Sequence, residues 1–263
     1  MKYISFLIFL FYGFSLGLSQ QTVKPSFEKA EFSYNGKTLP YRILKPVDFD
    51  PSKQYPLHIF LHGSGERGSD NKSQLAHGSE LFIQKSKKFP AIVIFPQCPV
   101  NDFWAQRSYS RDTINNENIF DFPTNPTPSW AMRAVIALLE EQLQLEYIDR
   151  NRVYLGGLSM GGMGTFELLA HKPKIFAAAT PICGGGNPEL LKGYAQEVPL
   201  WIFHGDADKV VPVRYSKIMV EGLIKEGIEP KFTVYPGVGH NSWTPAFAEP
   251  DLFEWIYDHH KGK

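Results

Sequence analysis

The sequence has few cysteines, no excess of either charge and no low-complexity tract. Its 263 residues include two cysteines, Cys98 and Cys183, which are too few for a disulfide scaffold or a cysteine-based metal cluster. Its 27 basic side chains balance its 27 acidic ones, so no global positive field favours binding to nucleic acid. The hydrophobic content of 43% excludes an intrinsically disordered chain. These absences indicate a neutral globular protein that does not bind nucleic acid.

Long apolar runs are also scarce, because only the N-terminal segment has one. Lys2 precedes the apolar stretch 4–18, and the small residues Gly17 and Ser19 come just before Gln20. This pattern is typical of a secretory signal peptide, so we expect residues 1–19 to be removed after Ser19. An uncleaved anchor is the alternative, but it would need about 20 apolar residues. The mature chain, residues 20–263, is then expected to be secreted or periplasmic and free of the membrane.

The mature chain alternates short apolar runs with helical patterns. Continuous apolar runs suit parallel strands that are buried on both faces of a sheet. Such runs occupy 57–61, 91–95, 153–155, 176–182, 200–203 and 232–235, and helical patterns occupy 131–142, 161–171, 213–226 and 252–260. This alternation predicts a single α/β domain with a mostly parallel sheet and helices on both faces. Reactive groups are then expected beyond the carboxyl ends of the strands.

Two segments depart from that alternation. Residues 27–34 and 39–44 flank Asn35-Gly36, a dipeptide that suits a tight hairpin turn, so they predict an antiparallel N-terminal edge. The stretch 96–128 is rich in aromatic residues and long for a loop, and long ordered loops in compact domains tend to be functional. We therefore interpret this stretch as a lid or a wall of a binding site, although its aromatic residues could instead pack only against one another.

The strongest chemical motif is Gly-x-Ser-x-Gly at 157–161. It follows an apolar strand and precedes a helical pattern, which is the context of a nucleophile elbow. In such an elbow the central residue, Ser159, is exposed above the sheet, at a helix N-terminus that favours developing negative charge. A serine hydroxyl is a poor nucleophile until a neighbouring base removes its proton. The motif therefore predicts a histidine and a carboxylate nearby.

Candidates for these partners follow two later strands. His204-Gly205-Asp206-Ala207-Asp208 comes after the run 200–203, and His240 follows the run 232–235. The chain order of serine, aspartate and histidine is that of the nucleophile-elbow architecture and differs from the orders of two other serine-protease folds. Either Asp206 or Asp208 could orient His240. His204 is expected to be structural, as is His62 in the turn after residues 57–61.

These motifs together resemble the α/β-hydrolase superfamily. The likeness covers about residues 55–260, and it is carried by the segments 61–65, 96–99, 157–161, 204–212 and 239–240. Within that superfamily, the sequence is most similar to single-domain esterases of the dienelactone hydrolase, phospholipase/carboxylesterase and feruloyl-esterase-like groups. The resemblance implies Ser159 as nucleophile, Asp208 as acid and His240 as base. It also implies an oxyanion hole formed by the backbone amides of Ser64 and Met160, and no metal or organic cofactor.

The sequence also suggests substrate contacts. Trp104 and Arg107 follow the segment 96–99 and are expected to overhang the site, and Trp243 comes three residues after His240. Aromatic faces suit sugar rings or phenolic acyl groups, and arginine suits a carboxylate. With the export signal and the family likeness, these residues lead us to expect a serine carboxylic-ester hydrolase acting on acetyl or hydroxycinnamoyl esters of carbohydrate.

Two other functions stay open at this point. One is a serine peptidase of the prolyl-oligopeptidase type, although the sequence has no repeats of the kind that build the propeller domain of such enzymes. The other is a non-catalytic binding protein on a hydrolase fold, although the nucleophile, the base and the acid are all present. Cys98 and Cys183 are predicted to lie about 14 Å apart, from three strand spacings, and so to remain unpaired.

Overall fold

The centre of the fold is an eight-stranded sheet. The computed structural model describes residues 25–262, so the signal peptide expected at 1–19 lies outside the described residues. The strand order is β1 (Glu28–Tyr34), β2 (Lys37–Leu44), β4 (Ile92–Pro96), β3 (Tyr55–Leu61), β7 (Ile148–Leu158), β8 (Ala178–Ile182), β9 (Trp201–Gly205) and β10 (Lys231–Tyr235). Strands β1, β2 and β4 pair antiparallel, and the remaining pairs are parallel. The predicted α/β sheet with an antiparallel edge is confirmed.

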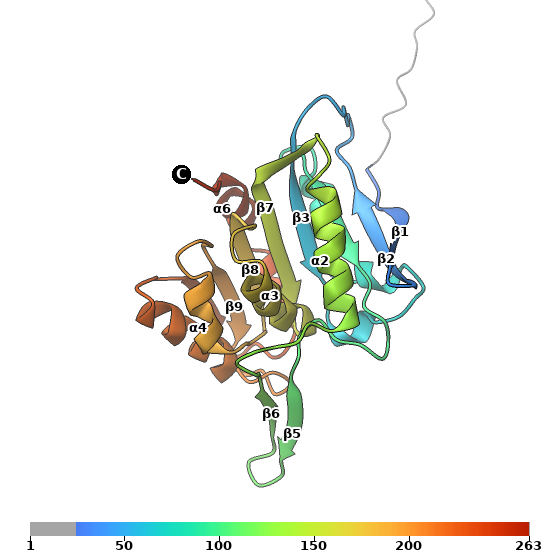
Figure 1. Cartoon of the computed structure of the whole chain (residues 1–263). Helices are drawn as coiled ribbons and strands as arrows, with labels where there is room; N and C mark the ends of the chain where they lie inside the picture. Colours follow the sequence, from blue (N-terminus) through green and yellow to red (C-terminus); the bar gives the residue numbers. More distant parts are fainter. Residues whose placement is uncertain (1–24, 263) are drawn as a thin grey trace, which may run out of the picture.

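Helices cover both faces of this sheet, as predicted. One face packs against α2 (Trp130–Gln142), α3 (Met160–His171) and α4 (Arg214–Lys225), which lie in front of the sheet in Figure 1. The other face packs against α1 (Ser79–Lys85), α5 (Trp243–Phe247) and α6 (Leu252–Asp258). In β3 the side chains alternate between the two layers: Leu57 and Ile59 belong to the first core, and Phe60 belongs to the second. This double burial explains why the strand is apolar throughout.

The N-terminal hairpin has the expected turn. Asn35 and Gly36 both have positive φ angles, +46° and +73°, as a two-residue turn with the right-handed twist of its strands requires. Arg42 of β2 ties the hairpin to the rest of the chain, since its Nε donates to the carbonyl of Asn71 at 2.5 Å. Because β2 pairs with β4, the hairpin forms this edge of the sheet.

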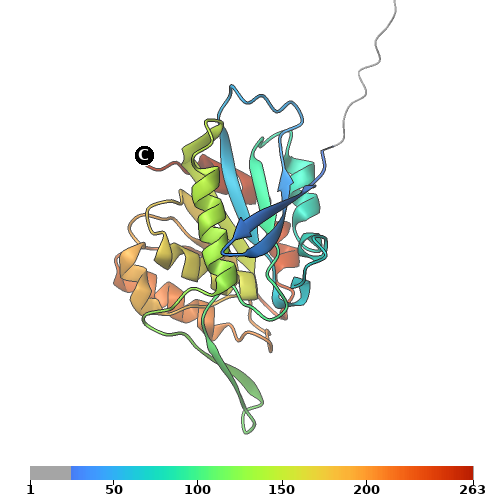
Figure 2. The same cartoon turned by 45° about the vertical axis from the view of Figure 1, so that its right-hand side comes forward.

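The aromatic stretch 96–128 is not an irregular loop throughout. It contains a second, two-stranded antiparallel sheet, β5 (Ser108–Asp112) and β6 (Glu117–Asp121), joined by a turn in which Asn116 has a φ of +54°. This hairpin projects beyond the end of the main sheet to which the parallel strands point (Figures 1 and 2). Within residues 25–262, no helix has both the length and the apolar character to span a bilayer.

Candidate active site

Ser159 lies at a sharp turn between β7 and α3. Its φ and ψ are +55° and −117°, a strained conformation for a residue with a side chain. The flanking glycines allow this turn, because a Cβ on Gly157 would lie 2.4 Å from the carbonyl oxygen of Gly161, and a Cβ on Gly161 would lie 1.9 Å from that of Leu61. The turn therefore packs backbone against backbone, and it presents the Ser159 hydroxyl at the N-terminus of α3.

His240 and Asp208 complete a chain of hydrogen bonds that starts at Ser159. The Ser159 hydroxyl lies 2.9 Å from Nε2 of His240, and Nδ1 of His240 lies 2.7 Å from Oδ2 of Asp208. The three residues come from loops after β7, β9 and β10, so the sheet brings together positions up to 81 residues apart. The structure thus joins the three side chains that the sequence analysis assigned to nucleophile, base and acid.

The surroundings of Asp208 keep its carboxylate ionised. Burial alone would raise the pKa of Asp208, but hydrogen bonds from His204 and His240 outweigh that effect and hold the pKa below its ordinary value. Oδ1 also accepts the backbone N–H groups of Val210 and Val211, at 2.8 and 2.9 Å. His204 is fully buried and lies 3.2 Å from Oδ2, so it supports the acid and does not face a substrate.

Asp206, the other candidate acid, has a different partner. Its Oδ1 accepts the backbone N–H of Gly237 at 2.7 Å, and no hydrogen bond joins it to His240. Gly237 has a φ of +71° in the turn that leads to His240. Asp206 therefore braces the loop that carries the histidine, and not only its own turn.

The expected oxyanion donors lie at two helix starts. Ser64 is the first residue of the single-turn 3-10 helix Ser64–Glu66, and Met160 is the first residue of α3. The backbone N–H of a first helical residue has no acceptor within its helix and is free to bind an anion. A Cβ on Gly63 would lie 3.6 Å from Cβ of Ser159, so the turn before Ser64 lies against the nucleophile.

His62 orients this turn. Its Nε2 accepts the backbone N–H of Cys98 at 2.9 Å, so Nδ1 carries the proton and donates to the carbonyl of Gly63 at 2.6 Å. Because a trans peptide points its N–H opposite to its C=O, this bond turns the Ser64 N–H away from His62. Burial lowers the pKa of His62 to about 4, which keeps the imidazole neutral. The structural role expected of His62 agrees with this geometry.

The structure corrects the expectation for Trp104. Its side chain is fully buried, and its Nε1 donates to the carbonyl of His62 at 3.0 Å. A Cβ on Gly164 of α3 would lie 2.4 Å from Cβ of Trp104, so the indole packs on that helix and cannot overhang the site. Trp104 instead supports the turn that holds Ser64. Sequence reasoning placed it on the surface because it treated the whole aromatic stretch as a loop.

Arg107 and Trp243 are placed differently from Trp104. The indole of Trp243 lies edge-on to the imidazole of His240, with ring centres 5.5 Å apart. The guanidinium of Arg107 lies over the rings of Phe103 and Phe120, at 4.9 and 5.1 Å. Burial and the charge of Arg67 lower the pKa of Arg107. Of the three expected substrate contacts, Trp243 therefore borders the triad directly, and Arg107 lies in the aromatic stretch at the base of the hairpin.

The hairpin β5–β6 docks on the loop that carries the acid. Asn118 Nδ2 donates to the carbonyl of Val210 at 2.8 Å, and the hydroxyl of Tyr215 accepts the backbone N–H of Phe120 at 2.7 Å. Sequence reasoning missed this hairpin. The available signal was Asn115-Asn116, a turn dipeptide between two short polar runs.

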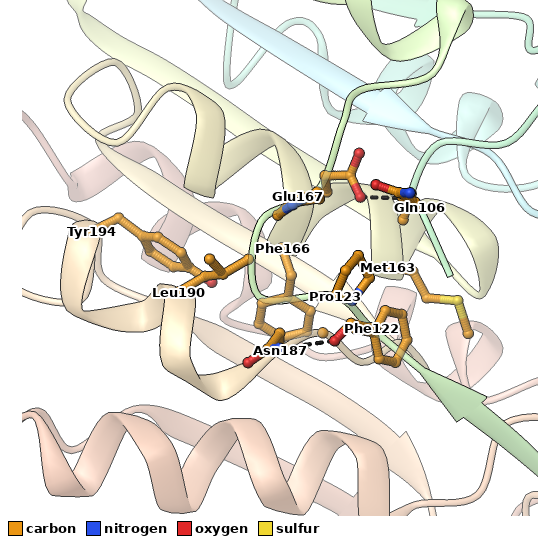
Figure 3. A pocket seen from close by; sticks show the side chains of 12 residues that line it. Gln106, Phe122, Pro123, Met163, Phe166, Glu167, Asn187, Leu190 and Tyr194 are labelled. Carbon is orange, nitrogen blue, oxygen red and sulfur yellow. Dashed lines mark hydrogen bonds between the residues drawn. The ribbon is translucent and has the colours of Figure 1, made fainter. Parts of the chain in front are cut away.

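An apolar pocket of about 300 Å³, open solvent included, lies under the base of this hairpin (Figure 3). Met163 and Phe166 of α3 line it, one and two turns from Ser159, together with Phe122 from the segment after β6. The carboxylate of Glu167 closes its rim by accepting the backbone N–H of Gln106 at 2.6 Å, the bond drawn in Figure 3. No triad side chain lines this pocket.

Both cysteines are free, as predicted. Burial raises the pKa of each thiol, so neither offers a thiolate at neutral pH. Among the described residues, the potential metal ligands that group together are Cys183, Asp208 and His240, with ligand atoms within 4.8 Å of one another. Because Asp208 and His240 already bond to each other and the thiol stays protonated, this group does not fit a resident metal.

The sheet, the elbow and the order of the three side chains define an α/β-hydrolase of the serine-esterase type. A family model described as phospholipase/carboxylesterase matches residues 47–256. The chain therefore belongs to the phospholipase/carboxylesterase family.

Individual relatives agree with this membership. Acyl-protein thioesterase 1 of Neurospora crassa is 37% identical over 112 residues, 36% of this chain and 42% of that protein. The bifunctional acetylxylan esterase/xylanase XynS20E of Neocallimastix patriciarum is 36% identical over 91 residues, 34% of this chain and 13% of that protein. A crystal structure of a thermostable esterase has a TM-score of 0.79 and 34% identity, and covers 89% of this chain and 63% of that one. The matches thus span less than half of these two curated relatives.

Proposed function

We propose that this protein is a secreted or periplasmic serine hydrolase of carboxylic esters. The observation that carries the proposal is the contact of 2.9 Å between the Ser159 hydroxyl and a His240 that is itself bonded to an ionised Asp208. Membership of the phospholipase/carboxylesterase family supports the same reaction. A binding protein derived from a hydrolase would have no need to retain this hydrogen-bonded chain.

In the proposed reaction, Nε2 of His240 takes the proton as Ser159 Oγ attacks the ester carbonyl. Asp208 holds Nδ1–H and stabilises the imidazolium that forms. The amides of Ser64 and Met160 bind the negative oxygen, and each donor of this kind contributes about 3–4 kcal/mol to transition-state stabilisation in characterised enzymes. His240 then protonates the leaving alcohol, and water releases the acyl group by the same steps.

The proposed substrates are acetyl or hydroxycinnamoyl esters of carbohydrate. The indole of Trp243 beside His240 supports a substrate with a ring next to the reacting bond. The likeness to a bifunctional acetylxylan esterase supports a carbohydrate, whereas the likeness to acyl-protein thioesterase 1 supports a second candidate, the hydrolysis of acyl thioesters on proteins.

Initial rates on a matched panel separate these substrates. The panel contains acetylated xylan, methyl ferulate, 4-nitrophenyl acetate, an S-palmitoylated peptide and a proline-containing peptide amide, with Ser159→Ala as the blank. We expect kcat/KM to be highest for the acetyl or feruloyl esters and to vanish in the variant. A preference for the S-palmitoylated peptide would replace the carbohydrate proposal with the thioesterase, and efficient peptide cleavage would favour a peptidase.

The proposed export has its own test. Expression of the full chain in a bacterial host, followed by N-terminal sequencing of the periplasmic or extracellular protein, is expected to give Gln20 as the first residue. Retention of Met1 in a membrane fraction would favour the uncleaved anchor instead.

A further inference from the structure

A carboxylate that the catalytic chain does not use lies beside the nucleophile. Oε2 of Glu66 lies 2.9 Å from the position that a Cβ on Gly63 would occupy, and that same position lies 3.6 Å from Cβ of Ser159. The Glu66 carboxylate and Ser159 therefore lie on either side of Gly63, and both are close to it. A Cβ at position 63 would displace the Glu66 carboxylate or the Leu158 side chain, whose Cδ1 also lies 2.9 Å from that position.

This carboxylate has few partners within the described residues. Its side chain is 15% exposed, and its ion-pair partner is Nε2 of His77, at 3.7 Å, which is beyond hydrogen-bond distance. An ionised carboxylate has about four sites that can accept hydrogen bonds. Because the Glu66 side chain is partly exposed, these acceptor sites are open to a ligand that carries hydrogen-bond donors.

The backbone of Glu66 is held firmly. Its carbonyl accepts from Nε2 of the fully buried Gln97 at 3.2 Å, and the next turn is closed by the bond from Gly68 N–H to the Cys98 carbonyl at 2.9 Å. Gln97 is fixed in turn, since its Oε1 accepts the backbone N–H of Asn71 at 2.7 Å. The carboxylate is therefore attached to a pre-organised turn, which lowers the entropy cost of using it in binding.

The rings of His77 and Trp243 lie between Glu66 and His240 of the triad. The indole of Trp243 lies 5.5 Å from the His240 ring on one side and 5.0 Å from the His77 ring on the other. His77 contacts Glu66, so these residues form a continuous border from the base around to the oxyanion turn. The leaving alcohol must lie within reach of His240, which protonates it. Groups packed around His240 are thus on the alcohol side of the ester.

We propose that Glu66, His77 and Trp243 form a subsite for the alcohol portion of the ester, and that this subsite takes a neutral, polyhydroxylated ring. The carboxylate and the imidazole bind hydroxyl groups, and the indole packs against the apolar face of the ring. The negative charge of Glu66 disfavours alcohols that carry a carboxylate or a phosphate. This inference rests on the proposed ester hydrolysis and assigns its alcohol specificity.

The test compares substrates that share one acyl group. Acetylated xylobiose has hydroxyls on its alcohol portion, acetylated xylobiose carrying a glucuronate has an added charge, and 4-nitrophenyl acetate has neither. We measure kcat/KM for each with the wild type, Glu66→Gln and Glu66→Ala. Glu80→Gln is the matched control, because Glu80 is an exposed residue of α1 whose side chain contacts Gln84.

In Glu66→Ala, the ratio of kcat/KM for acetylated xylobiose to that for 4-nitrophenyl acetate is expected to fall by about tenfold or more, as the loss of bonds to a charged group implies. Glu66→Gln keeps the shape but removes the charge, so it is expected to raise the rate on the glucuronate-bearing ester relative to the neutral one. In the Glu80→Gln control, two ratios of kcat/KM are expected to equal those of the wild type: acetylated xylobiose to 4-nitrophenyl acetate, and the glucuronate-bearing ester to the neutral ester. Such opposite changes are not produced by general damage to the fold.

Three results would overturn the inference, and they can be told apart. If both ratios stay at wild-type values in the Glu66 variants, the subsite is wrong and the esterase proposal stands. If the wild type hydrolyses 4-nitrophenyl acetate but no acetylated sugar, the carbohydrate substrate and the subsite are both wrong. If it hydrolyses no ester at all, the proposed function itself fails.

Discussion

His58 offers a stability prediction whose size follows from its surroundings. It lies in β3, is 1% exposed and is enclosed by the rings of Phe82, Tyr154 and Tyr257. Neither of its ring nitrogens has a hydrogen-bond partner in the structure. Desolvation by burial lowers the pKa of His58 from 6.5 to about 3. The unfolded chain therefore binds a proton below pH 6.5 that the folded chain does not bind, so acid favours unfolding.

Replacement of His58 by Phe removes this proton uptake. At pH 4 the wild type has lost about 3 kcal/mol of unfolding free energy through His58 alone, because each pH unit below 6.5 costs about 1.4 kcal/mol. We therefore expect the difference in unfolding free energy, His58→Phe minus wild type, to rise by about 3 kcal/mol between pH 8 and pH 4. The pH 8 value serves as the internal reference for the change in volume and packing.

Urea unfolding followed by tryptophan fluorescence at pH 4, 5 and 8 measures this difference. Relative to its value at pH 8, the difference in unfolding free energy between His58→Phe and wild type is expected to be larger by about 2 kcal/mol at pH 5 and by about 3 kcal/mol at pH 4. Parallel pH dependence of the variant and the wild type would refute it, since that result would mean that the folded protein protonates His58 without penalty.

Three further predictions concern the site. Asp208→Asn is expected to lower kcat/KM by about 10³–10⁴-fold, whereas Asp206→Asn is expected to lower kcat/KM by less than about tenfold. Similar decreases in the two variants would contradict the assignment of Asp208 as the acid. Gly161→Ala is expected to destabilise the fold by about 3 kcal/mol or more, because its methyl group would collide with a backbone carbonyl, while Gly65→Ala, with open space around it, has little effect on the melting temperature. Trp104→Phe removes one buried hydrogen bond and is expected to cost about 1–3 kcal/mol of unfolding free energy; a raised KM with unchanged stability would restore Trp104 as a substrate contact.

Local chemistry explains why so much of the fold could be predicted from the sequence. Asn35-Gly36 tolerates positive φ angles, so the dipeptide alone predicts the edge hairpin. The elbow is likewise encoded within a few residues, because the glycines at 157 and 161 permit the conformation that Ser159 adopts. The carboxyl ends of parallel strands lie at one edge of a sheet. Because Ser159, Asp208 and His240 each follow such a strand, the sequence predicted that these distant residues would lie close together.

Features that depend on packing between distant segments could not be predicted in this way. Trp104 is buried because a glycine in α3 leaves room for its indole, and no pattern in residues 96–128 reveals that contact. Strand β5 is mostly exposed, and the two buried residues of β6 are Asn118 and Phe120, so neither strand has the apolar alternation that identifies a strand. Glu66 and His77 are ordinary polar residues in sequence, and only the fold places His77 between Glu66 and Trp243.

The most direct test of the central claim is covalent labelling with a fluorophosphonate, which reacts with activated serines. The account predicts one phosphonate per chain, located on the peptide that contains Ser159 by mass spectrometry, and no labelling of Ser159→Ala. It also predicts strongly slowed labelling of His240→Ala, since that variant lacks the base. Labelling at another serine, or unchanged labelling without His240, would contradict the account.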